Sequence, residues 1–158
     1  TAHIDNESGL DDIPDPTTMR GWIEAALART DHGAAELSVL IVDSAEMTSL
    51  NHQFRQQNKP TNVLSFAADL PDGVTVPLLG DIAICAQVVE QEAREQGKTS
   101  AAHWAHMLVH GTLHLLGYDH LDDSEAEQME AMETAIITAL GFPPPYDDTH
   151  TDTTEART

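Results

Sequence analysis

The pattern of hydrophobic and polar positions along the chain predicts short strands that alternate with helices. Three runs rich in apolar and β-branched residues predict strands, namely ELSVLIVD at 36–43, NVLSFA at 62–67 and DIAICA at 81–86. Proline and glycine residues between the second and third runs favour a loop there, namely Pro71, Gly73, Pro77 and Gly80.

Five segments carry helix signals. Asp15 before Pro16 predicts the capped start of a helix that reaches about Arg29, and Ser44 predicts the cap of a second helix that ends before Lys59. Three further helices are expected at 88–96, at 100–116 and from a capping box at Asp122 to Gly141. Apolar residues of the last helix recur at helical spacing and should belong to the core, namely Met129, Met132, Ile136, Ile137 and Leu140.

These elements predict an α+β layer structure in one domain, residues 1–146, with three or four strands and about five helices. A chain of 158 residues, 41% of them hydrophobic, can bury its own core. The polar segment 147–158 is expected to be a disordered tail. No leader or membrane-spanning run is evident, and Cys85 is the only cysteine, so a reducing, cytoplasmic location is expected.

Charge is unevenly distributed along the chain. Seven basic and 27 acidic residues give a net charge of −20, which repels phosphate backbones. Two long segments, 47–68 and 96–118, nevertheless contain no acid, and they carry Arg55, Lys59 and Lys98. These segments could meet as one anion-tolerant site, although burial alone would also exclude acids from them.

The stretch HGTLHLLGYDH, residues 110–120, has the spacing of metal ligands. His110 and His114 project from one helix face a turn apart, and Gly117 allows the backbone to leave the helix in a left-handed conformation. The chain can then present His120 as a third ligand. Three imidazoles suit zinc and leave its fourth tetrahedral position open, as in catalytic sites.

The same histidine spacing occurs in metzincin proteases, where a glutamate after the first histidine is the general base. Gly111 occupies that position here and offers no proton acceptor, so peptide hydrolysis by this route is not expected. His103 and His106 share nearly the same helix face. They are either hydrogen-bond partners of the ligands or ordinary core residues.

Two other motifs, LNHQFRQQNKPTNVLSF and LLGDIAIC, precede the histidine motif along the chain. With these three motifs, the chain from about Glu36 to Leu140 resembles the YbeY family of bacterial endoribonucleases and ribosomal-RNA maturation factors. The resemblance implies a zincin-like α+β fold with a small mixed sheet, one zinc ion and cleavage of single-stranded RNA. It also implies roles in 16S ribosomal-RNA 3′ end maturation and ribosome quality control, with the ribosome or small-subunit assembly factors as partners.

By position, the resemblance makes His110, His114 and His120 the zinc ligands and Arg55 the functionally important arginine. Because its planar guanidinium matches two phosphate oxygens, Arg55 is predicted to act in catalysis with His110 and in RNA binding with Lys59. No general base is assigned, since hydroxide on zinc or attack by a ribose 2′-hydroxyl would need none. Two alternatives stay open: a non-catalytic, zinc-braced ribosome-assembly factor, and a metal-dependent hydrolase of another substrate.

Overall fold

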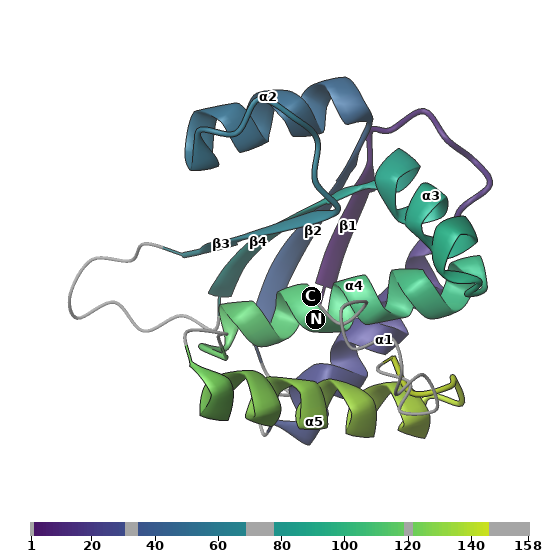
Figure 1. Cartoon of the computed structure of the whole chain (residues 1–158), viewed down its shortest axis with the longest axis vertical. Coiled ribbons are helices and arrows are strands. Elements are labelled where there is room, and N and C mark those ends of the chain that lie inside the picture. The colour runs from purple at the N-terminus through teal and green to yellow at the C-terminus, as the bar shows by residue number, and fades with distance from the viewer. Residues whose placement is uncertain (1, 31–34, 69–77, 119–121, 146–158) are drawn as a thin grey trace.

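A four-stranded mixed sheet forms the centre of the fold (Figure 1). The computed structural model describes residues 2–30, 35–68, 78–118 and 122–145. The strands lie in the order β1-β2-β4-β3, where β1 is Ala2–Asn6, β2 is Glu36–Val42, β3 is Val63–Ala67 and β4 is Leu78–Cys85. β1, β2 and β4 are parallel, whereas β3 runs antiparallel to β4 and forms one edge.

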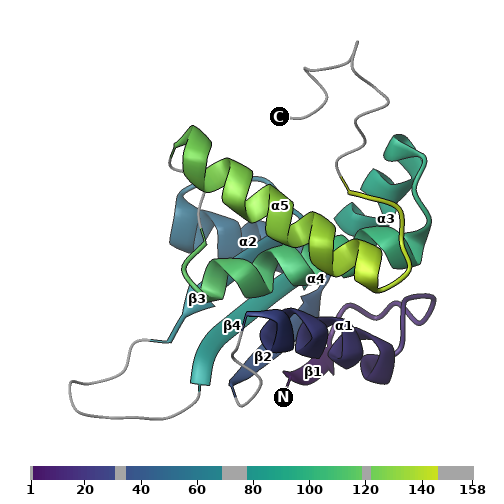
Figure 2. The ribbon, with the colours of Figure 1, turned by 90° about the horizontal axis from the view of Figure 1, so that it is seen from below.

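The helices lie on both faces of this sheet. They are α1 (Pro16–Arg29), α2 (Ser44–Arg55), α3 (Ala86–Gln96), α4 (Ser100–Leu115) and α5 (Asp123–Ala139). α2 covers one face, α1 and α4 cover the other, and α5 packs on the outer side of α4 and α1 (Figures 1 and 2). The predicted α+β fold with a small mixed sheet and about five helices is confirmed.

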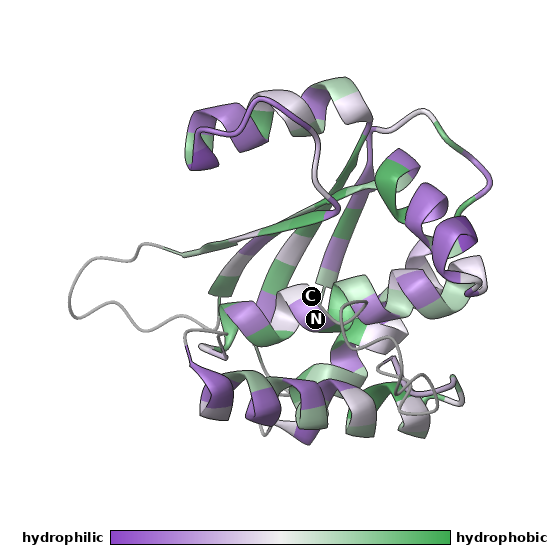
Figure 3. Cartoon of the chain, viewed as in Figure 1, coloured by the Kyte–Doolittle hydropathy of each residue, from purple (hydrophilic) through white to green (hydrophobic). Residues whose placement is uncertain are grey.

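Alternation along the strands divides the core between the two faces, because successive side chains of a strand point to opposite sides. Leu37, Val39 and Ile41 of β2 join the main cluster that includes α1, α4 and α5. Val42 joins a smaller cluster with Met47 of α2. Hydrophobic residues accordingly dominate β3 and β4, whereas polar bands recur along β1, α2 and α5 (Figure 3). Within the described residues, no helix has both the length and the hydropathy needed to cross a bilayer.

Side-chain caps fix where α1, α2, α4 and α5 begin, whereas α3 has no side-chain cap. The Asp15 carboxylate accepts from the Thr18 amide at 2.8 Å, as the sequence predicted, and Asp122 caps α5 in the same way. The prediction that Ser44 caps α2 is wrong. Asp43 is the cap, since its carboxylate accepts from the Glu46 amide at 2.8 Å, and Ser44 is the first helical residue.

The sheet extends beyond the predicted strands in two places. β1 pairs with β2, although its sequence AHIDN is too polar to predict a strand. β4 begins at Leu78, so Gly80 lies within a strand and not in the predicted loop. The register shifts between Glu36 and Leu37, which pair with Leu78 and Gly80, so Leu79 has no partner in β2. The neighbouring Gly80 has a φ of +145°, which favours glycine at this irregularity of the strand. The predicted tail, 147–158, lies outside the described residues.

Replacing Gly80 by alanine should destabilise the fold by about 1–3 kcal/mol, because the side chain would be both strained and overpacked. Its Cβ would lie 2.1 Å from the carbonyl oxygen of Phe66. Gly21→Ala in α1 is the matched control, since nothing lies within 4 Å of its Cβ and alanine favours a helix. Urea unfolding followed by circular dichroism measures both variants, and equal stabilities would contradict the prediction.

Candidate metal centre

The candidate site forms where α4 crosses the edge strand β3. Gly111 of α4 lies so close to the sheet that a Cβ there would come within 3.2–3.3 Å of the Ile82, Ser65 and Val63 side chains. The Ser65 hydroxyl donates to the Gly111 carbonyl oxygen at 3.0 Å. Glycine therefore permits the close approach of helix and strand, and a larger residue at this position would require the neighbouring side chains to shift.

A pocket of about 340 Å³ opens beside this contact. Its lining residues are Arg55, Asn62, Val63, Leu64, Ser65, Ala67, His110, His114 and Leu115. All of them belong to the acid-free segments 47–68 and 96–118, which confirms the hypothesis that the two segments meet. Among the described residues, the pocket lining therefore contains no carboxylate.

His110 and His114 face each other in this pocket. Their Nε2 atoms are 3.1 Å apart, and the rings lie at 77° to one another. Two nitrogens that bind one tetrahedral zinc ion at about 2.0–2.1 Å are about 3.3–3.4 Å apart. The observed pair is close to that separation, so it fits a shared metal ion.

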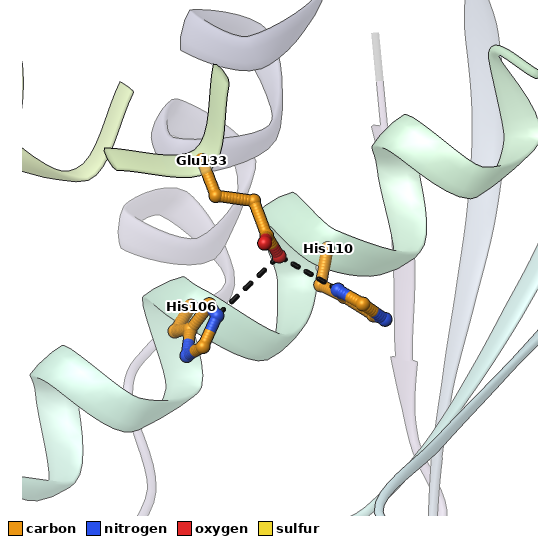
Figure 4. Close-up of side chains that lie close together, drawn as sticks. All are labelled: His106, His110 and Glu133. Carbon is orange, nitrogen blue, oxygen red and sulfur yellow. Dashed lines mark hydrogen bonds and ion pairs between the residues drawn. The ribbon is translucent and has the colours of Figure 1, made fainter. Parts of the chain in front are cut away.

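The carboxylate of Glu133, from α5, reaches between His106 and His110 of α4 (Figure 4). Its Oε2 is 2.6 Å from Nδ1 of His110 and 3.3 Å from Nε2 of His106. The carboxylate is completely buried between α4 and α5. These three side chains lie close enough together that the group could hold a metal ion.

The protonation state of this group follows from its hydrogen bonds. Burial alone would raise the pKa of Glu133, but hydrogen bonds from His106 and His110 outweigh it and bring the pKa to about 2. An ionised carboxylate only accepts, so Nδ1 of His110 carries a proton and donates it. The other ring nitrogen, Nε2, faces away from Glu133 (Figure 4). Burial lowers the pKa of His106, and Glu133 opposes that effect only in part.

A second glutamate–histidine pair lies further along α4. Nε2 of His103 is 2.9 Å from Oε1 of Glu92, and the Asn62 amide donates to the same oxygen at 3.1 Å. Burial would raise the pKa of Glu92, but the hydrogen bonds from His103 and Asn62 lower it below its ordinary value. Because Asn62 lines the pocket, this network connects the buried His103 to the site.

Arg55 ends α2 on the opposite wall of the pocket. Its Nη2 donates to the Ser65 carbonyl oxygen at 3.3 Å, and its Cζ lies 5.5 Å from the centre of the Phe66 ring. Ser65 therefore contacts both α4, through its hydroxyl, and Arg55, through its carbonyl. Lys59 is exposed and is not one of the lining residues.

The structure thus places three of the predicted site residues, Arg55, His110 and His114, around one pocket. Gly117 has a φ of +101°, which confirms the predicted left-handed exit from the helix. The predicted third ligand, His120, lies outside the described residues.

Sequence reasoning missed Glu133 because it belongs to a helix rich in acids. Its position carries a signal nonetheless: Glu133 is the one acid among the buried residues of α5, which are otherwise Met129, Ile136 and Ile137. An acid on the apolar stripe of a helix needs a buried partner, and the histidines of α4 supply it.

Comparison with known proteins identifies the family. The sequence model described as Endoribonuclease YbeY matches residues 3–141. The chain belongs to this family. Endoribonuclease YbeY of Cellvibrio japonicus (strain Ueda107) is 52% identical over 145 residues, which are 92% of this chain and 82% of the relative. Endoribonuclease YbeY of Pseudomonas entomophila (strain L48) is 54% identical over 140 residues, 88% of each chain.

A solved structure supports the same YbeY-type fold. The solution structure of TM1509 from Thermotoga maritima superposes with a TM-score of 0.61 at 25% sequence identity. The superposition covers 98% of this chain and 95% of the other. The predicted YbeY membership is therefore confirmed, and at the level of the family so is the prediction of an RNA-cleaving hydrolase.

Glu92→Gln should reduce the acid sensitivity of folding. The folded-state pKa of Glu92 is depressed below 4.5, so ionised Glu92 stabilises the protein above about that pH, and the stabilisation is lost as the pH falls further. The variant should therefore be less stable than wild type at neutral pH, and the difference should shrink below pH 4.5. Urea unfolding over a pH series tests this, and a constant difference would contradict it.

Proposed function

We propose that this protein is a zinc-dependent endoribonuclease that cleaves single-stranded RNA. The observation that carries the proposal is the pair of Nε2 atoms, of His110 and His114, 3.1 Å apart in an acid-free pocket beside Arg55. Membership of the YbeY family supports RNA as the substrate. We extend the proposal to 16S ribosomal-RNA 3′ end maturation and ribosome quality control in the cytoplasm, with the ribosome or small-subunit assembly factors as partners.

Zinc would be held by His110, His114 and His120. The group of His106, His110 and Glu133 fits zinc less well, because 2.6 Å between Nδ1 and Oε2 is a hydrogen-bond length and ligands of one tetrahedral zinc are about 3.3 Å apart. We therefore assign Glu133 to the orientation of His110. A bound zinc ion would lower the pKa of a water molecule and polarise a phosphoryl oxygen.

The protein's own residues bind and orient the RNA. A guanidinium has five N–H donors, more than the contacts of Arg55 with the Phe54 and Ser65 carbonyls use. Arg55 can therefore bind phosphate oxygens while it stays fixed to β3, and it would stabilise the charge that builds on phosphorus. Exposed Lys59 adds attraction at longer range. No carboxylate among the described lining residues can serve as the general base, so no side chain is given that role.

His114→Ala should abolish stoichiometric metal binding, whereas Arg55→Glu should keep the metal and lose RNA cleavage by at least about 100-fold. Metal analysis and a labelled single-stranded RNA assay measure the two effects. Arg29→Glu, an equal charge change on the exposed end of α1, is the control and should behave as wild type. Full activity in both site variants would refute the proposal. Cleavage that disappears from all preparations on purification would favour the zinc-braced assembly factor instead.

Glu133→Gln should weaken zinc binding by about 10–100-fold, because a neutral amide holds the Nδ1 proton of His110 less strongly than a carboxylate does. Competition with a chromogenic chelator measures the affinity directly, without an activity assay. Glu92→Gln is the matched control, since it alters the other buried glutamate–histidine pair of α4, between Glu92 and His103. Equal zinc affinities of the two variants would remove Glu133 from this role.

A further inference from the structure

An aromatic ring is exposed next to Arg55, which lines the pocket. Phe54, in the last turn of α2, has 49% of its surface accessible to solvent. Among the described residues only Leu78 is a comparably exposed large hydrophobic side chain. Single exposed apolar residues are common on proteins, so exposure alone assigns Phe54 no function. Its neighbours do.

Phe54 is part of an ordered group of three side chains, which we call the aromatic ledge: Phe54, Arg55 and Phe66. The rings of Phe54 and Phe66 are 5.0 Å apart at an interplanar angle of 60°, within the range of favourable aromatic pairs. Arg55 lies over the Phe66 ring at 5.5 Å. Arg55 also lines the pocket with His110 and His114 and so links the ledge to the candidate metal centre, whereas neither ring is a lining residue and Phe66 packs in the cluster on the α2 face of the sheet.

The charges around the ledge select its ligand. The segment 47–68, which supplies all three residues, contains no acid, but Phe66 pairs across the sheet with the exposed Asp81 of β4. A carboxylate at this border repels a phosphate and can accept a hydrogen bond from an amino group. The two rings of the ledge therefore suit a flat, neutral group with a π-face, whereas a phosphate belongs beside Arg55.

We propose that the aromatic ledge is a stacking subsite for one unpaired nucleobase of the RNA whose phosphate enters the pocket. This inference rests on the proposed endoribonuclease function. It assigns a binding site to a nucleobase of the substrate, whereas the metal centre binds the phosphate. Base stacking on aromatic side chains requires a base that is free of its own helix. The ledge thereby provides a physical reason for preferring single-stranded over double-stranded RNA.

The test compares Phe54→Ala with Phe54→Trp, which retains a stacking face, and with Leu78→Ala, the control at an exposed apolar residue that is not part of the ledge. The probes are a labelled single-stranded RNA, the same strand in a duplex, and a set of single strands with one abasic nucleotide. Binding is measured by fluorescence anisotropy and cleavage as kcat/KM, with thermal unfolding as the check on folding.

Phe54→Ala should weaken binding and kcat/KM on the single strand by about 5- to 150-fold. The duplex should be unaffected, so the preference for single strands narrows by the same factor. Phe54→Trp and Leu78→Ala should stay near wild type. When the abasic nucleotide is at one particular position of the strand, the affinity and kcat/KM of the wild type should fall by the same factor. Those of Phe54→Ala should not fall further.

Several results would overturn the ledge. They are wild-type behaviour of Phe54→Ala, an equal loss on duplex and single strand, or the same loss at every abasic position. A folded Phe54→Ala that binds and cleaves RNA normally but no longer joins ribosomal particles would make the ledge a protein contact instead. Wild-type protein that binds RNA without cutting it would refute the nuclease proposal. The binding of wild type and Phe54→Ala to single strand and duplex would still test the ledge. Failure to bind RNA at all would refute both.

Discussion

The close contact of α4 with β3 at Gly111 is the constraint on which the site depends. The missing side chain brings the helix near enough for Ser65 to donate to the Gly111 carbonyl oxygen at 3.0 Å. The same strand residue accepts from Arg55 through its own carbonyl. One residue of an edge strand thus sets the position of the arginine relative to the helix that carries His110. A bulkier residue than glycine would press against the Ile82, Ser65 and Val63 side chains at this contact.

The sequence of α4 contains no acid, and the carboxylates that contact this helix come from the flanking helices α3 and α5. Glu90 and Glu92 of α3 accept from Trp104 and His103, and Glu133 of α5 contacts the buried His106 and the partly exposed His110. Each carboxylate is thereby partnered where α4 packs against its neighbours, and an unpaired one would be costly to bury. On the pocket side of α4, the described lining residues include no carboxylate. Burial and anion tolerance, two explanations for the acid-free segments, therefore apply to different faces of one helix.

Local signals predicted most elements, but not the pairings between them. Helix caps at Asp15 and Asp122, and the glycine exit at Gly117, depend on a few neighbouring residues and were predictable. The polar edge strand β1 was not, because its place in the sheet comes from pairing with β2 and not from its own composition. The prediction that Gly80 lies in a loop failed for a related reason, since glycine favours both turns and irregular positions within strands. The histidine spacing pointed to His110 and His114, whereas the partnership with Glu133 joins residues of two helices that no local pattern connects.

The net charge of −20 limits how such a protein can bind RNA. Repulsion between exposed charges is screened beyond about 8 Å at physiological ionic strength, so distant acidic residues oppose binding little and the groups near the contact decide it. Within contact distance, the described pocket lining presents the Arg55 guanidinium and imidazoles, and the uncharged rings of Phe54 and Phe66 lie next to that guanidinium. Stacking contributes affinity without neutralising phosphates, and it therefore does not depend on the counterion release that drives binding to basic proteins. An acidic endoribonuclease of this design would select its substrate by short-range shape and stacking. A single strand offers both an accessible phosphate and an unpaired base for these contacts.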